Sequence, residues 1–398
     1  MPRPLLAVVS PFIDKRHGTE RRVAECVERL SGDFEIHVYS QRVEDVDLSR
    51  IVWHRVSALP GPHLFAYLWW FAANHFRRWR DRRFRGLVPA LVYSPGINCW
   101  DADAISVHVL FARLRMSLGD EMSFARNPVR VWPRLLHRRL YYRLIESLER
   151  RIYTRENVPL ALVSKKIARD LDEFYGRAGN LRVVYGGLDL ARFNPERRVG
   201  LRSQAREAFG LGPSDFAVLL IGNDWKSKGL PCLLQAAGAI GNSHLRILVA
   251  GTDTAAPYAS AIERFRLSGR VQFLAPRADV EFFYAAADAY VSPSLEDAFA
   301  QPPAEAMACG LPVITSRNNG GSEIISHEAD GLILEDPADS AVLAEMLRRL
   351  LDDSDFRMRL GQNAARTARK FTWDANAAQM KAMFDGGIQE KRAAQGTP

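Results

Sequence analysis

Residues 216–229 read FAVLLIGNDWKSKG, a short apolar run that ends in a glycine-bounded turn carrying two lysines. The run has the length and composition of a buried strand, and the turn leads into a stretch patterned as a helix. The same alternation of strand and helix recurs on both sides of this stretch. Such a pattern predicts parallel sheets built from βαβ units.

The other predicted strands are short β-branched or apolar runs, and those of the second half end in Gly, Pro, Ser or another turn former. In the first half they are LLAVV, FEIHVY, ALVYS, AISVHV and LALVS, and in the second LRILVAG, VQFL, AYVSPS, PVITS and GLIL. Because 398 residues exceed the size of one hydrophobic core, we expect an α/β chain of two doubly wound, Rossmann-like domains.

The turn formers and charges of VVYGGLDLARFNPERRVG place the expected domain boundary near Val183 to Arg202. The predicted segments are an N-terminal domain (1–183), a linker (184–202), a C-terminal domain (203–371), a helix (372–385) that returns to the N-terminal domain, and a flexible tail (386–398).

Composition indicates a soluble globular protein, with 47% hydrophobic and 25% charged residues. The four cysteines stand far apart, which favours neither a disulfide framework nor a zinc site and suits the cytoplasm. The apolar run at the N-terminus ends at Pro11 and fits a buried strand better than a signal peptide. The run 64–73 is far shorter than the ~20 residues of a membrane span.

Charge is unevenly distributed along the chain. Residues 1–200 hold 34 Lys and Arg against 22 Asp and Glu, a net charge of +12, whereas residues 201–398 hold 20 against 24, a net charge of −4. The basic half is expected to meet an anionic partner, either a membrane surface, an acidic acceptor or nucleic acid. A merely solvated basic face is the alternative.

Ligands of parallel sheets bind beyond the carboxyl ends of the strands, so the loops there are the candidate sites. Gly18 opens a helix after the first strand, where backbone amides can face an anion, although a simple tight turn fits as well. His108 ends the strand AISVHV and can exchange hydrogen bonds with a ligand near neutral pH, although a core histidine is the alternative.

Two further loops carry charge. Lys226 and Lys228 converge with a helix N-terminus, as a diphosphate requires, or are solvated surface lysines. With a helix starting near Pro303, Asp297 and Glu305 can face one pocket and hold sugar or ribose hydroxyls, while the free amides of Phe299, Ala300 and Gln301 offer donors. A pair of helix-capping acids is the alternative.

Taken in order, these loops resemble those of the family 4 retaining glycosyltransferases of GT-B fold, notably lipopolysaccharide-core glucosyltransferases and phosphatidylinositol mannosyltransferases. HGTER is similar to the family's GG-x-E-R loop and VVYGGLDLARFNP to its linker. IGNDWKSKGLPCLLQA is similar to its lysine loop, LEDAFAQPPAEAMACGLPVITS to its E-x7-E region and NNGGSEII to the following turn. The resemblance spans nearly the whole chain.

The resemblance implies a GT-B fold with a cleft between the domains and a nucleotide-diphosphate sugar as donor, either a UDP- or a GDP-sugar. It implies that Glu305 binds the ribose, that Asp297 and His108 contact the transferred sugar, and that Lys228, with Lys226 beside it, neutralises the diphosphate. Gly18 would let the backbone approach that diphosphate. Transfer would retain the anomeric configuration, without a metal or another cofactor.

Three departures from the family pattern stand out. His17 replaces the first glycine of the GG pair, Asp297 replaces the first glutamate, and Ala298 and Ala300 replace glycines. Alanine disfavours a positive φ but keeps its backbone amide. The departures leave the required charges and donors in place, so they predict an altered donor preference.

The resemblance implies that the N-terminal domain, which is the basic half of the chain, recognises the acceptor. Residues 63–87 set Trp and Phe among six arginines, including Arg77, Arg78, Arg82 and Arg83, and a second basic helix is expected at 133–151. Aromatic anchors with clustered cations suit an anionic membrane interface. We therefore expect peripheral docking on the cytoplasmic leaflet and an anionic glycan or lipid-linked acceptor, with no nucleic acid. An aromatic half that simply packs in the core is the alternative.

Two other functions fit parts of the pattern: a nucleotide-sugar epimerase of the same fold, and a non-catalytic relative that binds lipid or nucleic acid. The basic face argues against the epimerase, and the charged residues Lys228, Asp297 and Glu305 argue against the non-catalytic relative.

Overall fold

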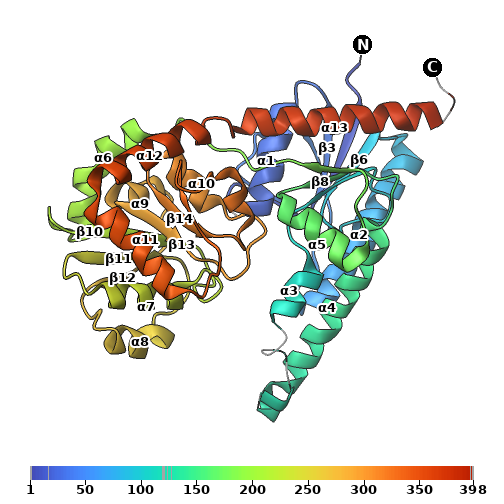
Figure 1. Cartoon of the computed structure of the whole chain (residues 1–398). Coiled ribbons are helices and arrows are strands. Elements are labelled where there is room, and N and C mark those ends of the chain that lie inside the picture. Colours follow the sequence, from blue (N-terminus) through green and yellow to red (C-terminus); the bar gives the residue numbers. More distant parts are fainter. Residues whose placement is uncertain are drawn as a thin grey trace. The chain divides into compact units, whose positions relative to one another are not determined.

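The structure is a computed structural model that describes residues 2–16, 18–118, 122, 124–126, 128–394 and 396. It divides into two compact units, unit 1 within Met1–Gly187 and Trp373–Pro398, and unit 2 within Leu188–Thr372. Each unit is a parallel sheet with helices on its faces (Figure 1). The predicted α/β class with two Rossmann-like halves is confirmed.

In the described residues of unit 1, seven strands form a sheet in the order β5-β3-β1-β6-β7-β8-β9. These strands are β1 (Leu5–Val9), β3 (Glu35–Ser40), β5 (Val52–Arg55), β6 (Leu91–Pro95), β7 (Ala104–Val107), β8 (Leu160–Leu162) and β9 (Leu181–Val183). The helices are α1 (Gly18–Leu30), α2 (His63–Arg85), α3 (Phe111–Ser117), α4 (Trp132–Tyr153), α5 (Lys165–Tyr175) and α13 (Trp373–Ala394). Small elements complete it: β2 (Phe12–Ile13) paired with β4 (Arg42–Val43), and the 3-10 turns Leu48–Arg50, Phe124–Arg126 and Val129–Val131.

Unit 2 has the sheet order β12-β11-β10-β13-β14-β15 across its described residues. Its strands are β10 (Phe216–Ile221), β11 (Leu245–Ala250), β12 (Val271–Leu274), β13 (Ala289–Ser292), β14 (Val313–Ser316) and β15 (Leu332–Leu334). Its helices are α6 (Pro195–Ala208), α7 (Leu230–Ile240), α8 (Ala259–Arg264), α9 (Glu281–Ala286), α10 (Gln301–Ala308), α11 (Ser340–Asp352) and α12 (Ser354–Ala368), with 3-10 turns at Ala256–Tyr258 and Gly320–Ile324.

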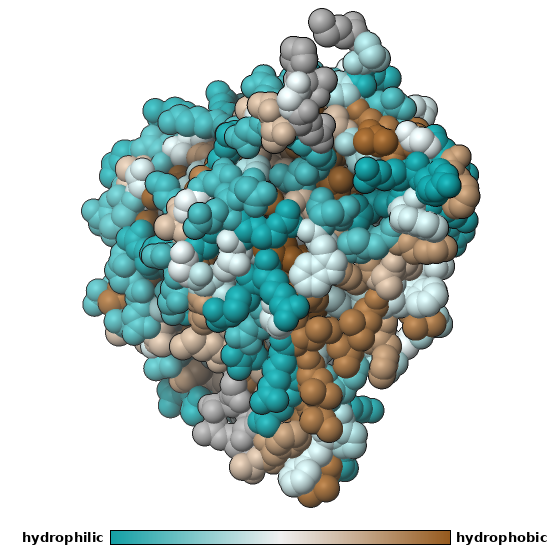
Figure 2. All heavy atoms as spheres, turned by 90° about the vertical axis from the view of Figure 1, so that its right-hand side faces the viewer, coloured by the Kyte–Doolittle hydropathy of each residue, from teal (hydrophilic) through white to brown (hydrophobic). Residues whose placement is uncertain are grey.

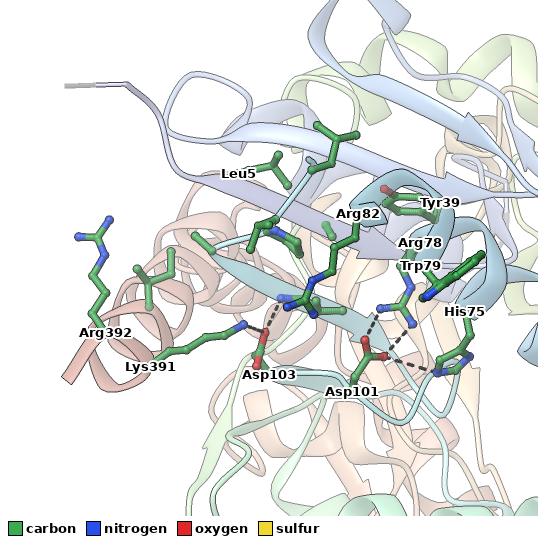
Figure 3. A pocket seen from close by; sticks show the side chains of 17 residues that line it. Leu5, Tyr39, His75, Arg78, Trp79, Arg82, Asp101, Asp103, Lys391 and Arg392 are labelled. Atoms are coloured by element: carbon green, nitrogen blue, oxygen red, sulfur yellow. Dashed lines mark hydrogen bonds and ion pairs between the residues drawn. The ribbon is translucent and has the colours of Figure 1, made fainter. Parts of the chain in front are cut away.

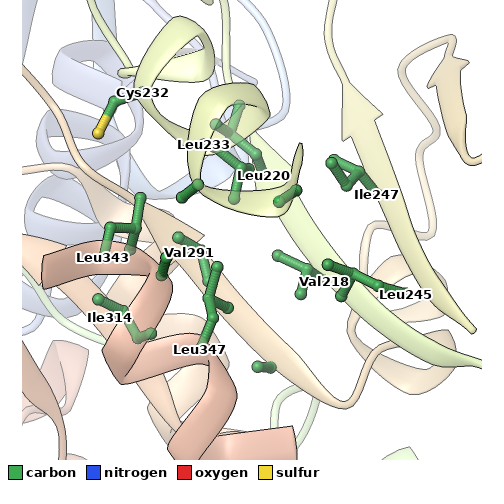
Figure 4. Close-up of a cluster of buried hydrophobic side chains, with 14 of the residues drawn as sticks. Val218, Leu220, Cys232, Leu233, Leu245, Ile247, Val291, Ile314, Leu343 and Leu347 are labelled. Atoms are coloured by element: carbon green, nitrogen blue, oxygen red, sulfur yellow. The ribbon is translucent and has the colours of Figure 1, made fainter. Parts of the chain in front are cut away.

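The core of unit 2 follows from the apolar strands that the sequence predicts. Val218 and Leu220 of β10 are fully buried, and Leu233 of α7 and Leu343 and Leu347 of α11 pack over the same face of the sheet (Figure 4). Fully burying a side chain of this size contributes about 1.5–3 kcal/mol to the stability of the fold. The packed core therefore holds the strand ends, and the loops that follow them, in place.

The segment 184–202, predicted as a linker, is not one along its whole length. Residues from Pro195 onward form α6, which belongs to unit 2. Its arginines anchor the helix on the end of α9, where Arg198 and Arg202 each donate to the carbonyl of Ala287 at 3.0 Å and Arg202 also binds the Asp288 carboxylate at 2.5 Å. Cations near helix carbonyls are favourable, and the sequence alone does not reveal these partners.

The C-terminal helix α13 belongs to unit 1, as the predicted return implies, but it continues beyond 385. Residues 386–394 are therefore helical and not the predicted flexible tail, because Ile388 is buried in the core of unit 1 with Met383 and Phe384. At its start, Gly187 packs against Trp373 so closely that a Cβ would lie 2.4 Å from the tryptophan backbone. Residues 395, 397 and 398 lie outside the described residues.

Candidate active site

The sheet of unit 2 has one place where its strand order reverses. β10 lies between β11 and β13, so the connections leaving β10 and β13 run to opposite sides. A crevice at the carboxyl ends of such strands is the usual ligand site of doubly wound sheets. The loops 222–229 and 293–300 begin at this point, and they carry the predicted donor-binding residues.

The two loops touch through Gly229. Its φ of 82° is left-handed, and a Cβ there would lie 2.0 Å from the carbonyl oxygen of Pro293, so only glycine fits. Beside it, the amide of Leu295 donates to the carbonyl of Ser227 at 2.8 Å. This close approach fixes Lys228 opposite the loop that follows β13.

Lys228 and Asp297 form an ion pair across these loops. Their side chains are 22% and 14% exposed, so the charges are partly desolvated but still open to a ligand. The other carboxylate oxygen, Oδ1 of Asp297, accepts from the amide of Phe299 at 3.2 Å. Lys226 lies exposed on the same turn, and its carbonyl accepts from the Gly229 amide at 3.1 Å.

The predicted free amides after Asp297 are mostly engaged. Phe299 donates to Asp297, and the amide of Ala300 donates to the side-chain oxygen of Asn319 at 3.1 Å. The fully buried Asn319 also accepts from Gly321 at 2.8 Å, so it ties this loop to the one after β14. The prediction of free amides is therefore wrong for Phe299 and Ala300, because neighbouring side chains take both donors. Gln301 begins α10.

The helix α10 starts at Gln301, two residues before Pro303, so Glu305 lies in its second turn and not in the predicted first turn. Glu305 is only 5% exposed, and the hydroxyl of Tyr284 donates to its Oε2 at 2.8 Å. Burial, followed by the nearby Glu305 charge, raises the pKa of Tyr284 well above its usual range, so the phenol stays a donor. Tyr284 and Asn319 were missed from sequence because neither belongs to the charged loops.

In unit 1, His108 follows β7 as predicted. Its Nε2 lies 2.7 Å from the hydroxyl of Ser106, which lies 2.7 Å from the hydroxyl of Tyr93. Burial and the nearby positive charge of Arg22 lower the pKa of His108 to about 3. The imidazole is therefore neutral at pH 7, and a neutral ring has one donor and one acceptor nitrogen. The serine two residues before the histidine on the strand is the signal that sequence reasoning passed over.

Gly18 is the first residue of α1, as the predicted strand-to-helix turn requires. A Cβ there would meet nothing within 4 Å, so the fold of unit 1 does not demand glycine at this position. His17, where the chain departs from the family pattern, lies outside the described residues. The arrangement leaves the N-terminus of α1 open.

The four arginines predicted for an anionic surface divide into two pairs. Arg78 is 10% exposed and forms two bonds of 2.6 and 2.7 Å with Asp101, while Arg77 pairs with the buried Asp81 at 3.2 Å. The surface prediction is therefore wrong for these two, since α2 turns them toward carboxylates of unit 1. Arg82 and Arg83 are exposed.

Exposed apolar side chains gather along α2 and α4. They include Phe65, Leu68, Trp69, Trp132, Leu136 and Leu140. Figure 2 shows hydrophobic side chains concentrated toward the lower end of this face. The helices contact each other through Tyr67 and Tyr141, whose ring centroids lie 6.3 Å apart. No described helix is long and apolar enough to span a membrane.

Residues 202–367 match the family model described as Glycosyl transferases group 1. The chain is similar to the D-inositol 3-phosphate glycosyltransferase of Corynebacterium efficiens, with 30% identity over 270 residues, 62% of this chain and 63% of the relative. It is also similar to that of Salinispora arenicola, with 31% identity over 246 residues, 56% of this chain and 54% of the relative. The chain thus spans less than two thirds of the length of these relatives.

Solved structures resemble the chain over nearly its whole length. WaaG, a glycosyltransferase involved in lipopolysaccharide biosynthesis, superposes with a TM-score of 0.76 at 19% identity and covers 96% of this chain and 100% of its own. HepE from Anabaena, in complex with UDP-glucose, has a TM-score of 0.71 at 18% identity and covers 96% and 99%. The likeness confirms the expected GT-B fold.

Proposed function

We propose that this chain, a GT-B protein whose residues 202–367 match the family model of the glycosyl transferases group 1, transfers a hexose from a nucleoside-diphosphate sugar to a glycan or lipid-linked acceptor. The donor is a UDP- or GDP-sugar. Transfer retains the anomeric configuration and uses no metal or other cofactor. Support comes from the family match, from the glycosyltransferase names of the relatives and from the site of unit 2.

The observation that carries this proposal is the Lys228–Asp297 pair at the strand-order reversal of unit 2. A diphosphate is a stronger partner for an ammonium group than a single carboxylate, since it carries more negative charge on convergent oxygens. On donor binding, Lys228 therefore turns to the diphosphate, with Lys226 beside it. Asp297 is then released to accept hydrogen bonds from hydroxyls of the transferred sugar.

Glu305 supplies the nucleoside contact in this proposal. Tyr284 holds its Oε2, which fixes the carboxylate plane so that ribose hydroxyls can donate to it. A buried carboxylate that accepts charge-assisted bonds discriminates strongly against a ligand that lacks the hydroxyls, because the charge would then remain unsatisfied. Phe299, Ala300 and Gln301 shape the loop between the two acids.

Unit 1 contributes the two remaining roles that the resemblance implies. The neutral imidazole of His108 hydrogen-bonds the transferred sugar, and the open N-terminus of α1 at Gly18 offers amides to the diphosphate. A low pKa suits His108 to this task, because a neutral ring does not repel the positive charge that develops at the anomeric carbon.

In the proposed reaction the bond between the anomeric carbon and the diphosphate oxygen breaks as the acceptor hydroxyl attacks from the same face. The acceptor oxygen forms the new bond to that carbon. Its proton passes to the departing phosphate oxygen, and the nucleoside diphosphate leaves. Lys228 stabilises the charge that accumulates on the leaving group.

The acceptor proposal rests on the basic N-terminal half and on the exposed apolar side chains of α2 and α4 (Figure 2). The exposed apolar side chains of α2 and α4, together with the exposed Arg82 and Arg83 in the last turn of α2, suit peripheral docking on an anionic leaflet on the cytoplasmic side. The acceptor carries anionic groups or a lipid. The D-inositol 3-phosphate in the names of the relatives is likewise anionic.

The decisive experiment is a thermal-shift screen against UDP-, GDP- and ADP-sugars, because a ligand that binds only the folded protein raises its melting temperature. We expect a UDP- or GDP-sugar to give a shift that Glu305→Ala and Lys228→Ala abolish. An unchanged shift in both variants would reject the donor site. Proton NMR of the product then reads the anomeric configuration.

The membrane proposal is tested separately by co-sedimentation with vesicles at low salt. Binding to vesicles that contain phosphatidylglycerol should exceed binding to pure phosphatidylcholine, and should weaken when Arg82 and Arg83 become glutamine. Equal binding to both kinds of vesicle would reject docking on an anionic surface.

A further inference from the structure

A cavity in unit 1 lies away from the loops of the candidate active site. Its volume is about 670 Å³, and its floor is the face of the sheet that carries Leu5, Ala7 and Val92. Leu5 begins β1, and Asp103 immediately precedes β7, so the cavity opens toward the amino ends of these strands. Gly18 and His108 follow the carboxyl ends, so the cavity is a separate site.

Two helices form the walls. From α2 come His75, Arg78, Trp79 and Arg82, spaced so that they share one helix face, and from the end of α13 come Ile388, Lys391 and Arg392. Residues 87–90, which follow α2, also line the cavity. A cavity of this size lies within the range that holds small-molecule ligands, about 300–1,000 Å³.

Ion pairs hold both carboxylates of the cavity. Asp101 accepts two bonds from Arg78, at 2.6 and 2.7 Å, and lies 3.5 Å from His75, so that both side chains turn toward it in Figure 3. Although burial alone would raise its pKa, these contacts hold the pKa of Asp101 far below its usual range. Asp103 accepts from Lys391 and from the amide of Val92, at 2.7 and 2.8 Å.

The remaining cations are unmatched. Four cationic side chains line the cavity, Arg78, Arg82, Lys391 and Arg392, against two carboxylates, a formal surplus of two positive charges. Within the described residues, the side chains of Arg82 and Arg392 have no hydrogen bond or ion pair. Arg82 reaches in from α2 and Arg392 stands at the opposite rim on α13 (Figure 3).

We propose that this cavity binds a phosphate monoester. A monoester carries close to two negative charges at neutral pH, which offsets the formal surplus of two positive charges in the cavity, and its three oxygens can accept hydrogen bonds from a guanidinium group. Guanidinium forks recognise phosphate in a bidentate manner and are weakly hydrated, so they suit a partly enclosed site better than lysines. The side chains of Trp79, Val88 and Ile388 offer an apolar surface to the rest of the ligand.

The ester has two possible sources with the same chemistry, a soluble phosphorylated metabolite and the headgroup of an anionic lipid. The position of Arg82 on α2, the helix that we propose to dock on the membrane, fits a lipid headgroup. The position of the cavity floor on the sheet fits a soluble metabolite. The inference does not depend on the transfer reaction, because no residue of the donor site lines the cavity.

The test measures binding of glycerol 3-phosphate to the full chain by titration calorimetry, and of vesicles with and without phosphatidic acid by co-sedimentation. The double variant Arg82→Gln/Arg392→Gln is compared with Arg80→Gln/Arg366→Gln, which removes the same charge from two exposed positions outside the cavity. We expect binding at least about tenfold weaker in the first variant than in the second, since each lost charge-assisted bond contributes measurably. Binding of glycerol 3-phosphate would indicate the soluble source. Binding of phosphatidic acid vesicles that exceeds binding of phosphatidylglycerol vesicles of equal charge, without binding of glycerol 3-phosphate, would indicate the lipid source, and either result supports the site.

The proposal is overturned by equal binding of the two double variants, or by the absence of binding of either probe to the unchanged chain at millimolar concentration. Lys228→Met keeps the cavity intact and removes the proposed diphosphate contact. Binding that persists in this variant therefore assigns the probe to the cavity, and binding that disappears refutes the cavity. Arg82→Lys/Arg392→Lys retains charge without the forked geometry, and its affinity should fall between the other two.

Discussion

Replacing Lys228 by methionine separates the electrostatic role of this side chain from its contribution to folding. The Lys228–Asp297 pair is partly exposed, at 22% and 14%, so its contribution to stability is about 1 kcal/mol once solvent screening is allowed for. Asp297 keeps the hydrogen bond from Phe299 in the variant. The melting temperature of the protein should therefore fall by only about 2–4 °C.

Activity should fall far more. If Lys228 stabilises the leaving diphosphate, its loss resembles the loss of an oxyanion donor, which lowers kcat by about 10²–10³-fold. The assay is release of nucleoside diphosphate from the donor, with Lys370→Met as an exposed control elsewhere in unit 2. A decrease of less than about fivefold refutes the assigned role, and a fall in melting temperature above about 8 °C would instead indicate structural damage.

Three further outcomes follow from buried polar groups. Tyr284→Phe removes one hydrogen-bond donor from the Glu305 carboxylate, which costs about 1–3 kcal/mol. Calorimetry should therefore show that the nucleotide sugar binds at least about fivefold more weakly. Unchanged affinity would show that Tyr284 has no role in the site. Burial raises the pKa of Glu149 to about 7 despite three donated hydrogen bonds, so this group takes up a proton on folding. The contribution of Glu149 to stability is present below about pH 4.5 and is lost as the pH rises through about 7. Urea denaturation should therefore show that the free energy of unfolding falls by about 3 kcal/mol over this range, and that the fall is absent in Glu149→Gln. Arg78→Gln should destabilise unit 1 by about 1–2 kcal/mol, less than for a fully buried pair because Asp101 is more than half exposed, whereas Arg83→Gln should change stability by less than about 0.5 kcal/mol in the same denaturation experiment.

The strands that the sequence predicted are those whose apolar runs end in turn formers, such as β10 and β13. β5 was not predicted because its short sequence VWHR has no such run. It is an edge strand, and its buried His54 pairs with Asp81 at 2.8 Å. That stabilisation comes from a partner on α2, which local patterning does not reveal.

The candidate site was likewise only partly predictable from the sequence. The charges of Lys228, Asp297 and Glu305 could be placed from the order of strands and turns, because the carboxyl ends of parallel strands meet at one edge. The hydrogen bond from the Ala300 amide to Asn319 and the one from Tyr284 to Glu305 could not be predicted, since Asn319 and Tyr284 come from other parts of the chain. Arg78 was misplaced for the same reason, because its partner Asp101 lies on a separate loop.

The assignment of α13 to unit 1 has a consequence for biosynthesis. Met380, Met383 and Phe384 pack inside the core of unit 1, although the ribosome makes them after all of unit 2. Unit 2 is continuous in sequence and can fold as soon as it emerges, whereas unit 1 exposes the apolar groove of its last helix until synthesis reaches residue 394. The first domain to be translated is therefore the last to be completed, and during that interval its incomplete core is open to aggregation.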